Sequence, residues 1–587
     1  MKHAKYWSEN SVFDDKTRAE IKALIDRKDE KELTDRFYED LEFGTGGLRG
    51  ILGAGTNRMN IYNVKKATCA VAKYLKKTFP SDRELKVAIS HDSRRFSREF
   101  AETTASVMAA NGIKSLITKE LRPVPMLSFM TKKYGCHAGI CITASHNPPE
   151  YNGYKVYWTT GGQLVPPHDK GIIDVYKGIE SYNDLPSIPY HEGIRSGMIS
   201  EIGDQLDNDY LEKVQGLSLR KEGRDGFKIV YSPLHGSGLT PVTSALKRFG
   251  FEKVIIVPEQ EKPDGNFPTV KSPNPEDKDA LKLAVELAKK ENADLVMGTD
   301  PDSDRLGIVA REKGQYIAFN GNQIGCLLID YILCALKEQG RLPDNALVIK
   351  TIVTTDLQKE IAEYYGASIE DTLTGFKWIC DLIENYESGR KKPYKKFICG
   401  GEESYGFLMD SFVRDKDAVI SCAIAAEMTA YYKSKGLSLA GALDNIFKRH
   451  GIYMESLHTV TMPGMDGSIK IKEIMKKLQE SPPRIIDGNN VVKLMDFQLS
   501  QELGWDGNKF KVINSITLPK SNVLQFILED GTKVTARPSG TEPKIKFYFS
   551  VKEKVSANIS DKELGERKEH CLKRIERIKE TFVSMMH

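Results

Sequence analysis

A serine in a short turn-forming segment is the first group in this sequence that could act as a nucleophile. Ser145 belongs to Thr143-Ala144-Ser145-His146-Asn147-Pro148-Pro149 and lies just after the apolar run 138–143. Two prolines, with Asn152-Gly153 shortly after them, predict a rigid turn that could hold the hydroxyl outward at the end of a strand. His146 could orient that hydroxyl or be a structural turn residue. A serine beside a histidine is by itself weak evidence for a nucleophile, but the position of Ser145 directly after the apolar run strengthens this interpretation.

Three aspartates alternate with other residues in Asp300-Pro301-Asp302-Ser303-Asp304-Arg305, directly after the apolar run 295–297. Carboxylates at alternate positions of a loop can converge on one side, where they offer hard oxygen ligands to a divalent cation. An EF-hand loop is excluded, because Arg305 stands where glycine is required and Arg311 stands where glutamate is required. We therefore predict a Mg²⁺ site, since few protein ligands leave room for phosphate oxygens. A solvated acidic turn is the alternative.

Two further glycine-containing loops carry groups that suit a phosphorylated sugar. The segment Gly401-Glu402-Glu403-Ser404-Tyr405-Gly406 sets acceptors and a hydroxyl among glycines, as a polyol requires, although acidic turns of this kind are also common structural loops. The segment Arg537-Pro538-Ser539-Gly540-Thr541 combines a guanidinium, two hydroxyls and glycine-exposed backbone N–H groups. This density of donors favours phosphate binding over a plain turn.

Basic residues stand beside three more turns. Arg49 lies in the glycine-rich segment 44–50, and Lys377 ends Thr374-Gly375-Phe376-Lys377. The segment His91-Asp92-Ser93-Arg94-Arg95 could be a solvated charged turn or could support the serine loop. Segment 44–50 is no dinucleotide fingerprint, because Arg49 stands where the third glycine belongs. Walker A, G-x-S-x-G and H-E-x-x-H sequences do not occur, so a nucleotide triphosphatase, an α/β-hydrolase and a zinc protease lose their usual support.

The composition of the 587-residue chain is that of a folded soluble protein with several domains. With 85 basic and 81 acidic residues the net charge is only +4, so we expect no nucleic-acid or membrane partner. The chain has no run of 18 apolar residues and no apolar stretch at its start, so we expect a cytoplasmic protein. Nine dispersed cysteines without a C-x-x-C pair predict free thiols rather than disulfides or a zinc site.

The elements that must position these loops follow from the hydrophobic pattern. The first forty residues are helical in pattern, and a helix is also predicted over 279–291. Predicted strands, separated by helical patterns, are 86–90, 138–143, 228–232, 254–258, 293–298, 346–351 and 396–400. Ser145, Asp300 and Gly401 each follow a strand end, which is where open α/β sheets bind ligands. Three similar α/β units could therefore each contribute one loop to a shared cleft.

The last part of the chain has a different pattern. The runs 522–528 and 532–537 flank Glu529-Asp530-Gly531, which is typical of a hairpin, and 544–551 is a further predicted strand. A charged helix follows, with Leu572, Ile575, Ile578 and Phe582 on one side. We predict an α+β unit that acts as a lid.

Together these patterns predict the α/β class, with three similar α/β domains of mixed or parallel sheets and a smaller C-terminal α+β domain around a central cleft. The first expected domain, 1–215, carries a helical N-terminal extension and the serine loop. The second, 216–325, carries the aspartate loop, and the third, 326–455, carries the acidic glycine loop. The fourth, 456–587, is the phosphate-binding lid.

In this order, the four loops resemble the α-D-phosphohexomutase superfamily, which includes phosphoglucomutases and phosphomannomutases. The serine loop followed by Tyr151-Asn152-Gly153-Tyr154-Lys155 is similar to the family's phosphoserine loop, and the other three are similar to its metal, sugar and phosphate loops. The resemblance covers about residues 40–555. Segment 44–60 and the chain length are most similar to the longer phosphoglucomutase/phosphopentomutase branch.

The resemblance implies a phosphosugar mutase, an isomerase-class intramolecular phosphotransferase. Such an enzyme interconverts glucose 1-phosphate and glucose 6-phosphate through a phosphoserine and a bisphosphorylated sugar. Ser145 would carry the phosphate, Mg²⁺ would bind a phosphoserine oxygen, Asp300, Asp302 and Asp304, and glucose 1,6-bisphosphate would prime the enzyme. The implied catalytic residues are Ser145, His146, Lys155, Lys377 and Arg49. The implied substrate-binding residues are Arg305, Thr374, Gly375, Glu402, Ser404, Arg537, Ser539, Gly540 and Thr541.

Two features of this interpretation are open. Lys155 is the first candidate for the general acid/base and Lys377 the second, since crowding by cations can lower a lysine pKa. The sequence Thr374-Gly375-Phe376-Lys377 replaces the T-G-H-S of many bacterial phosphomannomutase/phosphoglucomutases, which favours glucose over mannose.

Phosphopentomutase, phosphomannomutase and sugar-bisphosphate synthase are alternatives within the superfamily. A metal-dependent sugar phosphatase and a non-catalytic sugar-phosphate sensor are alternatives outside it. A monomer and a homodimer are equally open.

Overall fold

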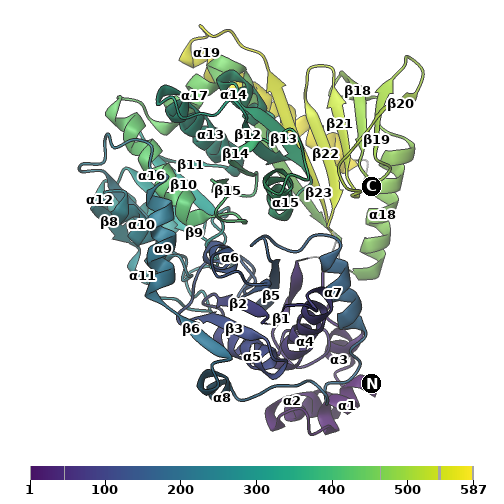
Figure 1. Cartoon of the computed structure of the whole chain (residues 1–587). Helices are drawn as coiled ribbons and strands as arrows, with labels where there is room; N and C mark the ends of the chain where they lie inside the picture. Colours follow the sequence, from purple (N-terminus) through teal and green to yellow (C-terminus); the bar gives the residue numbers. More distant parts are fainter. Residues whose placement is uncertain (1, 45, 83, 463, 540–543, 585–587) are drawn as a thin grey trace. The chain divides into compact units, whose positions relative to one another are not determined.

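The computed structural model describes residues 2–44, 46–82, 84–462, 464–539 and 544–584 (Figure 1). The chain forms two compact units. The first unit consists of Met1–Gly321, Phe376–Cys399 and Ser404–Gly436. The second unit consists of Asn322–Gly375, Gly400–Glu403 and Leu437–His587.

Three helices precede the first sheet, as the pattern of the first forty residues predicts. They are α1 (Lys2–Glu9), α2 (Asp15–Asp26) and α3 (Glu30–Phe37). Asp14 caps α2, because its Oδ1 accepts the backbone N–H of Thr17 at 2.7 Å. Trp7 is fully buried and stacks on Phe13, with ring centroids 4.1 Å apart. The helices therefore have an apolar cluster of their own.

The first sheet has six strands in the order β1-β5-β4-β2-β3-β6. They are β1 (Gly47–Ile51), β2 (Lys86–His91), β3 (Lys114–Thr118), β4 (Ala138–Ile142), β5 (Tyr151–Trp158) and β6 (Ile199–Ile202). Strands β2, β3, β4 and β6 run parallel, whereas β5 and β1 add antiparallel at one edge. All of β4 is buried, as expected of a strand covered on both faces. Its helices are α4 (Ile61–Thr78), α5 (Ser97–Ala110), α6 (Val124–Lys133), α7 (His168–Lys177) and α8 (Tyr190–Arg195).

The segment after the serine loop is strand β5, and not part of the rigid turn that Asn152-Gly153 predicts. Gly153 pairs with Arg49 of β1. A Cβ at Gly153 would lie 2.5 Å from the Thr143 carbonyl oxygen and 2.8 Å from that of Leu48. Glycine is therefore required here for close approach of three backbones rather than for a turn. As a consequence, Lys155 lies on a strand, in register with Cys141 of β4.

The second sheet, also in the first unit, has the order β11-β10-β9-β7-β8. Its strands are β7 (Lys228–Ser232), β8 (Lys253–Ile256), β9 (Leu295–Thr299), β10 (Leu306–Glu312) and β11 (Gln315–Phe319). Strands β8, β7 and β9 run parallel, and β10 and β11 are antiparallel. Nearby helices are α9 (Asp204–Gln215), α10 (Leu239–Arg248), α11 (Pro258–Glu261), α12 (Lys282–Glu291) and α16 (Ala418–Ser434). All of β9, which leads into the aspartate loop, is buried.

The third sheet has the order β13-β12-β14-β15. Its strands are β12 (Ala346–Thr351), β13 (Ser368–Thr372), β14 (Lys396–Glu402) and β15 (Gly406–Met409). Strands β12 and β13 are parallel. The helices in this part of the sequence are α13 (Gly321–Glu338), α14 (Leu357–Tyr365), α15 (Phe376–Glu387) and α17 (Leu439–His450).

The fourth sheet belongs to the second unit and is antiparallel in every pairing that the described residues make (yellow-green and yellow in Figure 1). Its order is β16-β23-β22-β21-β18-β19-β20, with β17 paired to β18. The strands are β16 (Ile452–Thr461), β17 (Ile485–Ile486), β18 (Asn489–Asp496), β19 (Gln501–Trp505), β20 (Phe510–Ser515), β21 (Leu524–Leu528), β22 (Lys533–Pro538) and β23 (Lys544–Glu553). Its helices are α18 (Gly464–Glu480) and α19 (Asp561–Ser584).

Most of the elements predicted from the sequence are present in these sheets. All seven predicted strands are present, as β2, β4, β7, β8, β9, β12 and β14, and the hairpin is formed by β21 and β22. The predicted charged helix is present as α19, and of the four residues expected on one side, Ile575, Ile578 and Phe582 are buried and Leu572 is 45% exposed. The boundaries of the four expected domains and the closure of a lid stay predictions.

Candidate active site

Ser145 lies in the turn that follows β4, and its side chain is almost completely buried. Its φ of 52° is left-handed, which is uncommon for a residue other than glycine. The backbone N–H donates to Thr143 Oγ1 at 2.8 Å, and the hydroxyl donates to Asp300 Oδ2 at 2.9 Å. The hydroxyl oxygen also lies 3.1 Å from His146 Nδ1. Within the first unit, the serine loop and the aspartate loop therefore meet at the serine hydroxyl.

Arg94 holds the serine loop in this conformation. Its buried guanidinium donates to the carbonyl oxygen of Ser145 at 2.6 Å and to that of Asn147. It also donates to the carbonyl oxygens of Pro148 at 2.9 Å and Tyr151 at 3.0 Å. Asp92 lies beside the guanidinium, with 3.4 Å between Arg94 Nε and Asp92 Oδ2. The segment 91–95 thus supports the serine loop and is no solvated turn.

Replacing Arg94 by methionine is expected to lower kcat about 100-fold, because misplacing a reacting group by about 1 Å can cost that much. Stability should also fall, by about 3 kcal/mol, since Asp92 loses its partner in the interior. Guanidinium ion added to the variant should restore part of kcat, which a general loss of packing would not permit. The control is Arg95→Met, because exposed Arg95 makes a single bond to the loop, from Nη2 to the Pro149 carbonyl oxygen. Equal losses in both variants would contradict the assignment.

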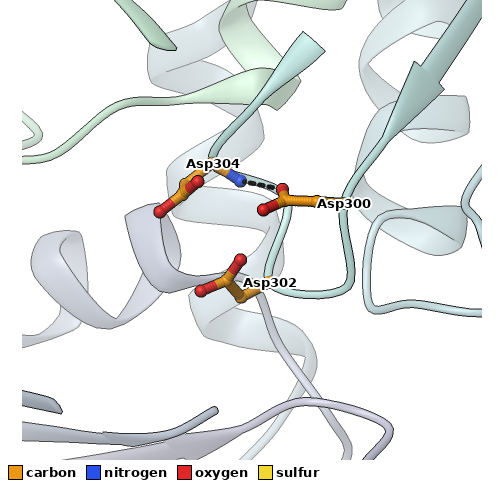
Figure 2. Close-up of side chains that lie close together, drawn as sticks. All are labelled: Asp300, Asp302 and Asp304. Atoms are coloured by element: carbon orange, nitrogen blue, oxygen red, sulfur yellow. Dashed lines mark hydrogen bonds between the residues drawn. The ribbon is translucent and has the colours of Figure 1, made fainter. Parts of the chain in front are cut away.

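The aspartate loop follows β9 and turns tightly, with Ser303 at a φ of 50°. Asp300, Asp302 and Asp304 are all buried, and they offer ligand oxygens that lie within 4.8 Å of one another. Asp300 Oδ1 accepts the backbone N–H of Asp304 at 3.0 Å, which Figure 2 shows, and that of Arg305 at 3.1 Å. The loop therefore directs its three carboxylates toward one point, as the alternating sequence predicts.

Two lysines engage one oxygen of each of the other two carboxylates. Lys155 Nζ lies 2.7 Å from Asp302 Oδ2 and 3.5 Å from Asp304 Oδ2. Lys416 Nζ lies 3.0 Å from Asp304 Oδ2. The Oδ1 atoms of Asp302 and Asp304 are buried, and among the described residues they receive no hydrogen bond. Buried carboxylate oxygens without a donor are costly unless a cation binds them, so this donor set fits a divalent metal ion.

The charges in this cluster shift its pKa values in opposite directions. Burial raises the pKa of Asp300 well above its ordinary value, and the negative charges of Asp302 and Asp304 add to this rise. Burial acts in the same direction on Asp304, but Lys416 and Lys155 outweigh it and hold the pKa of Asp304 below its ordinary value. Asp300, in contrast to Asp304, thus has a reason to bind a proton when no cation is present.

The two lysine candidates for the general acid/base also have pKa values that shift in opposite directions. Burial disfavours the charged form of Lys155, yet Asp302 and Asp304 hold its pKa above the ordinary value. The crowding by cations that the sequence argument assumed is therefore outweighed by carboxylates. Lys377, near the start of α15, has its pKa lowered by burial, with Asp169 opposing the shift only partly. In the absence of a bound metal ion these pKa shifts favour Lys377 over Lys155, and the choice between the two lysines stays a prediction.

The remaining predicted residues of the first unit make different contacts. Burial, together with the charges of Arg305 and Arg49, lowers the pKa of His146 well below its ordinary value, which favours the neutral form of its ring. Arg49 is exposed on β1 and donates to Asn147 Oδ1 at 3.2 Å. Arg305 forms an ion pair with Glu276. Ser404 also belongs to the first unit and follows β14.

The other predicted substrate residues belong to the second unit. Gly375, with a φ of 115°, donates its backbone N–H to Glu402 Oε1 at 2.9 Å. Thr374 Oγ1 is buried and has no hydrogen-bond partner among the described residues. Arg537 lies on β22, and the backbone N–H of Ser539 donates to the Lys544 carbonyl oxygen at 2.7 Å. Gly540 and Thr541 lie outside the described residues.

Two supporting residues of this site, Arg94 and Lys416, are not marked as such by the local sequence. Arg94 was one of two interpretations of a charged segment, and Lys416 was not considered. The available signal for Lys416 was the run Arg414-Asp415-Lys416-Asp417, in which four consecutive charged residues directly precede the apolar start of α16. All four are buried, which an exposed charged run would not be.

Comparisons with known proteins agree with this geometry. Models of the phosphoglucomutase/phosphomannomutase family match the chain, with α/β/α domain I at residues 40–183, domain II at 208–314 and domain III at 320–450. Together with the antiparallel C-terminal sheet, they confirm the predicted fold class. Among the helices that the structure describes, none is long and apolar enough to cross a membrane.

Curated relatives and solved structures are similar over most of the chain. A phosphoglucomutase of Staphylococcus epidermidis is 35% identical over 538 residues, which is 90% of this chain and 94% of the relative. A phosphoglucomutase of Staphylococcus aureus is 36% identical over 91% of this chain and 93% of its own length.

The crystal structure of a phosphoglucomutase/phosphomannomutase family protein from Burkholderia thailandensis has a TM-score of 0.63 at 18% identity, covering 91% of this chain and 96% of that one. The open form of Paramecium pp63/parafusin, a phosphoglucomutase, has a TM-score of 0.65 at 17% identity, covering 92% and 96%. These two structures show a shared fold, and the family models and curated relatives show more: this chain belongs to the phosphoglucomutase/phosphomannomutase family.

Proposed function

We propose that this chain is a phosphohexomutase that interconverts glucose 1-phosphate and glucose 6-phosphate. The observation that carries the proposal is the buried Ser145 hydroxyl, 2.9 Å from Asp300 in a triad of buried aspartates. The names of the curated relatives, which are phosphoglucomutases over nine-tenths of this chain, support glucose as the sugar.

In the proposed cycle Ser145 carries a phosphoryl group at rest. A sugar hydroxyl attacks the phosphorus, the bond from phosphorus to Ser145 Oγ breaks, and a neutral lysine amine takes the hydroxyl proton. The product is a sugar bisphosphate. The electron pair of the broken bond stays on Ser145 Oγ, which takes the proton from the lysine. After the bisphosphate turns over, Ser145 Oγ attacks its other phosphoryl group, and the lysine carries the serine proton to the departing sugar oxygen. The isomeric monophosphate then leaves, and phosphoserine is restored.

Positive charge is the main contribution that the surrounding side chains make to such a transfer, since little covalent chemistry falls to the protein. We propose that Asp300, Asp302 and Asp304 hold Mg²⁺, which when bound supplies Lewis-acid stabilisation of phosphate oxygens. Arg49, Arg305 and Lys155 add charge, and His146 supports Ser145. Thr374, Gly375, Glu402 and Ser404 would bind the sugar, while Arg537, Ser539, Gly540 and Thr541 would hold the phosphate that is not reacting.

We propose Lys377 as the general acid/base, because burial lowers its pKa. A base acts in its neutral form, so activity limited by Lys377 should rise with pH through a pKa below that of an ordinary lysine. Lys377→Met is expected to lower kcat about 100-fold and to flatten this rise. Lys155→Met should lower kcat but leave the rise in place. The measurement is kcat/KM against pH, with exposed Lys170→Met as the control. A rise that persists in Lys377→Met and vanishes in Lys155→Met would reverse the assignment.

The substrate is tested by following glucose 1-phosphate, mannose 1-phosphate and ribose 1-phosphate by ³¹P NMR with Mg²⁺ and glucose 1,6-bisphosphate present. Fastest isomerisation of glucose 1-phosphate is expected. Faster conversion of ribose or mannose 1-phosphate would make the chain a phosphopentomutase or a phosphomannomutase. Free phosphate as the main product would indicate a phosphatase, and binding without turnover would indicate a sensor.

Several further properties belong to the same proposal. Glucose 1,6-bisphosphate would prime the enzyme by phosphorylating Ser145. The protein would act on small sugar phosphates in the cytoplasm, as a monomer or a homodimer, without nucleic-acid or membrane partners. Its C-terminal domain would close over the intermediate, which must be kept from water.

A further inference from the structure

Lys416 lies in the segment between β15 and α16 and is almost completely buried. Its Nζ is 3.0 Å from Asp304 Oδ2 and 3.3 Å from Asp415 Oδ1. Its aliphatic stem fills the space beside Gly406, where a Cβ would lie 2.0 Å from Lys416 Cδ. The ammonium group also lies over the Phe376 ring, 5.6 Å from its centroid. Lys416 is therefore held on several sides with its charge directed at the aspartate loop.

Asp415 connects Lys416 to the strand that carries Lys155. Asp415 Oδ1 contacts the Lys416 ammonium and also accepts the Lys416 backbone N–H at 2.8 Å. Asp415 Oδ2 accepts the Tyr157 hydroxyl at 2.7 Å and Gln163 Nε2 at 3.1 Å. Tyr157 stands two residues after Lys155 on β5. Lys416 is thus linked through Asp415 to the strand that carries Lys155, and both lysines contact Asp304.

The two carboxylate oxygens of Asp304 are in different environments. Oδ2 is engaged by Lys416 and Lys155, whereas Oδ1 is buried and receives no hydrogen bond within the described part of the chain. A carboxylate with one oxygen fixed by ammonium groups cannot rotate freely, so its second oxygen keeps one direction. The charge of the three carboxylates is also partly offset by Lys155, Lys416 and Arg305, of which Lys416 pairs with Asp415 as well and Arg305 with Glu276.

We propose that Lys416 is a positioning residue of the phosphoryl-transfer site. Its ammonium fixes Asp304 so that Oδ1 is presented to the metal ion, and its charge offsets the loop's negative charge. This rests on the proposed function. Lys416 works against the affinity for the metal ion, because a positive charge beside a ligand repels a cation. It favours transfer, because the ligand stays where the reaction requires it.

The two opposed effects separate this role from a merely structural one. Lys416→Met removes the charge and keeps most of the stem, so the packing against Gly406 is retained. We expect the variant to bind Mn²⁺ at least as tightly as the wild type by isothermal titration calorimetry of the dephosphorylated protein. We expect its kcat to fall about 100-fold, with KM for glucose 1-phosphate changed less than about threefold. Lys416→Arg should recover part of kcat.

Two further variants complete the experiment. Asp415→Asn keeps the ammonium group but weakens its tether, so a smaller loss of kcat with unchanged Mn²⁺ affinity is expected. Lys433→Met is the matched control, because Lys433 also pairs with a buried aspartate of the first unit, Asp294, at 2.6 Å. It should leave both readouts at wild-type values.

Each outcome decides the question. Unchanged kcat in Lys416→Met would overturn the proposal. A loss of Mn²⁺ affinity together with a fall in melting temperature would also overturn it, because removal of a purely structural ion pair is expected to have those two effects. Failure of the proposed function is separate: the wild type would then show no isomerisation, whereas the Mn²⁺ titrations would still report whether Lys416 opposes cation binding.

Discussion

Replacing Ser145 by alanine is expected to lower the rate of glucose 1-phosphate isomerisation by at least about 10⁴-fold, because the transferred phosphoryl group then has no acceptor on the protein. The loss should appear in kcat, and addition of glucose 1,6-bisphosphate should not restore it. The measurement is the initial rate of glucose 6-phosphate formation with excess Mg²⁺.

The same variant should keep its metal site. Asp300 loses the hydroxyl that donates to its Oδ2, but Asp300 Oδ1 keeps its two backbone donors, so the loop retains its shape. Titration with Mn²⁺ should therefore give an affinity close to that of the unphosphorylated wild type. Ser93→Ala, which removes a hydroxyl from the adjacent segment 91–95, is the control and should stay active. Normal turnover by Ser145→Ala would refute Ser145 as the phosphoryl acceptor.

Asp302→Asn is expected to lower kcat about 1,000-fold, since a bound metal ion contributes several kcal/mol to stabilising the transition state. The substitution conserves size and removes the charge that pairs with Lys155 at 2.7 Å. Because an amide is a weaker ligand than a carboxylate, the Mn²⁺ affinity should also fall. Mg²⁺ titrations of activity and Mn²⁺ calorimetry measure the two losses.

High Mg²⁺ should restore part of the activity of Asp302→Asn, because the defect is one of metal binding. Asp225→Asn, at an exposed position of the same unit, should behave as the wild type at every Mg²⁺ concentration. An Asp302→Asn variant that keeps wild-type activity and affinity would exclude Asp302 as a ligand. Chelation of the wild type with EDTA should abolish turnover, and Mg²⁺ should restore it.

Local patterns were sufficient to predict much of the fold. The apolar runs before Ser145 and Asp300 predicted β4 and β9, because a strand covered on both faces needs continuous apolar residues. The alternating aspartates likewise predicted a convergent triad, since their spacing along a tight loop sets where the carboxylates point.

Long-range contacts explain what the sequence could not show. Arg94 supports Ser145 across 51 positions of the chain, and Lys416 reaches Asp304 from α16's leading segment. No periodic pattern in the local sequence identifies such partners, and a charged segment that is buried in the fold can have the same residues as one that is exposed. The prediction of a turn at Asn152-Gly153 was wrong for the same reason. Glycine is required at position 153 because the backbones of Leu48 in β1 and Thr143 before the serine loop pack against this point of β5.

The pKa of Lys155 shows a further limit. Crowding by cations was inferred from the number of basic residues near glycine turns, but the nearest charges to its ammonium are two carboxylates. Which sign of charge lies closest to a side chain is a property of the folded chain.

The central claim, that the Ser145 hydroxyl carries the transferred phosphate, is tested most directly by intact-mass and peptide mass spectrometry. The protein is first dephosphorylated, then incubated with Mg²⁺ and glucose 1,6-bisphosphate. One added phosphate, located on Ser145, is the predicted result. If this phosphate carries ¹⁸O and unlabelled glucose 1-phosphate is then supplied in excess over enzyme, the label should pass to the sugar while Ser145 ends with unlabelled phosphate. Phosphate at another residue, or isomerisation by a protein that never carries phosphate on Ser145, would contradict it.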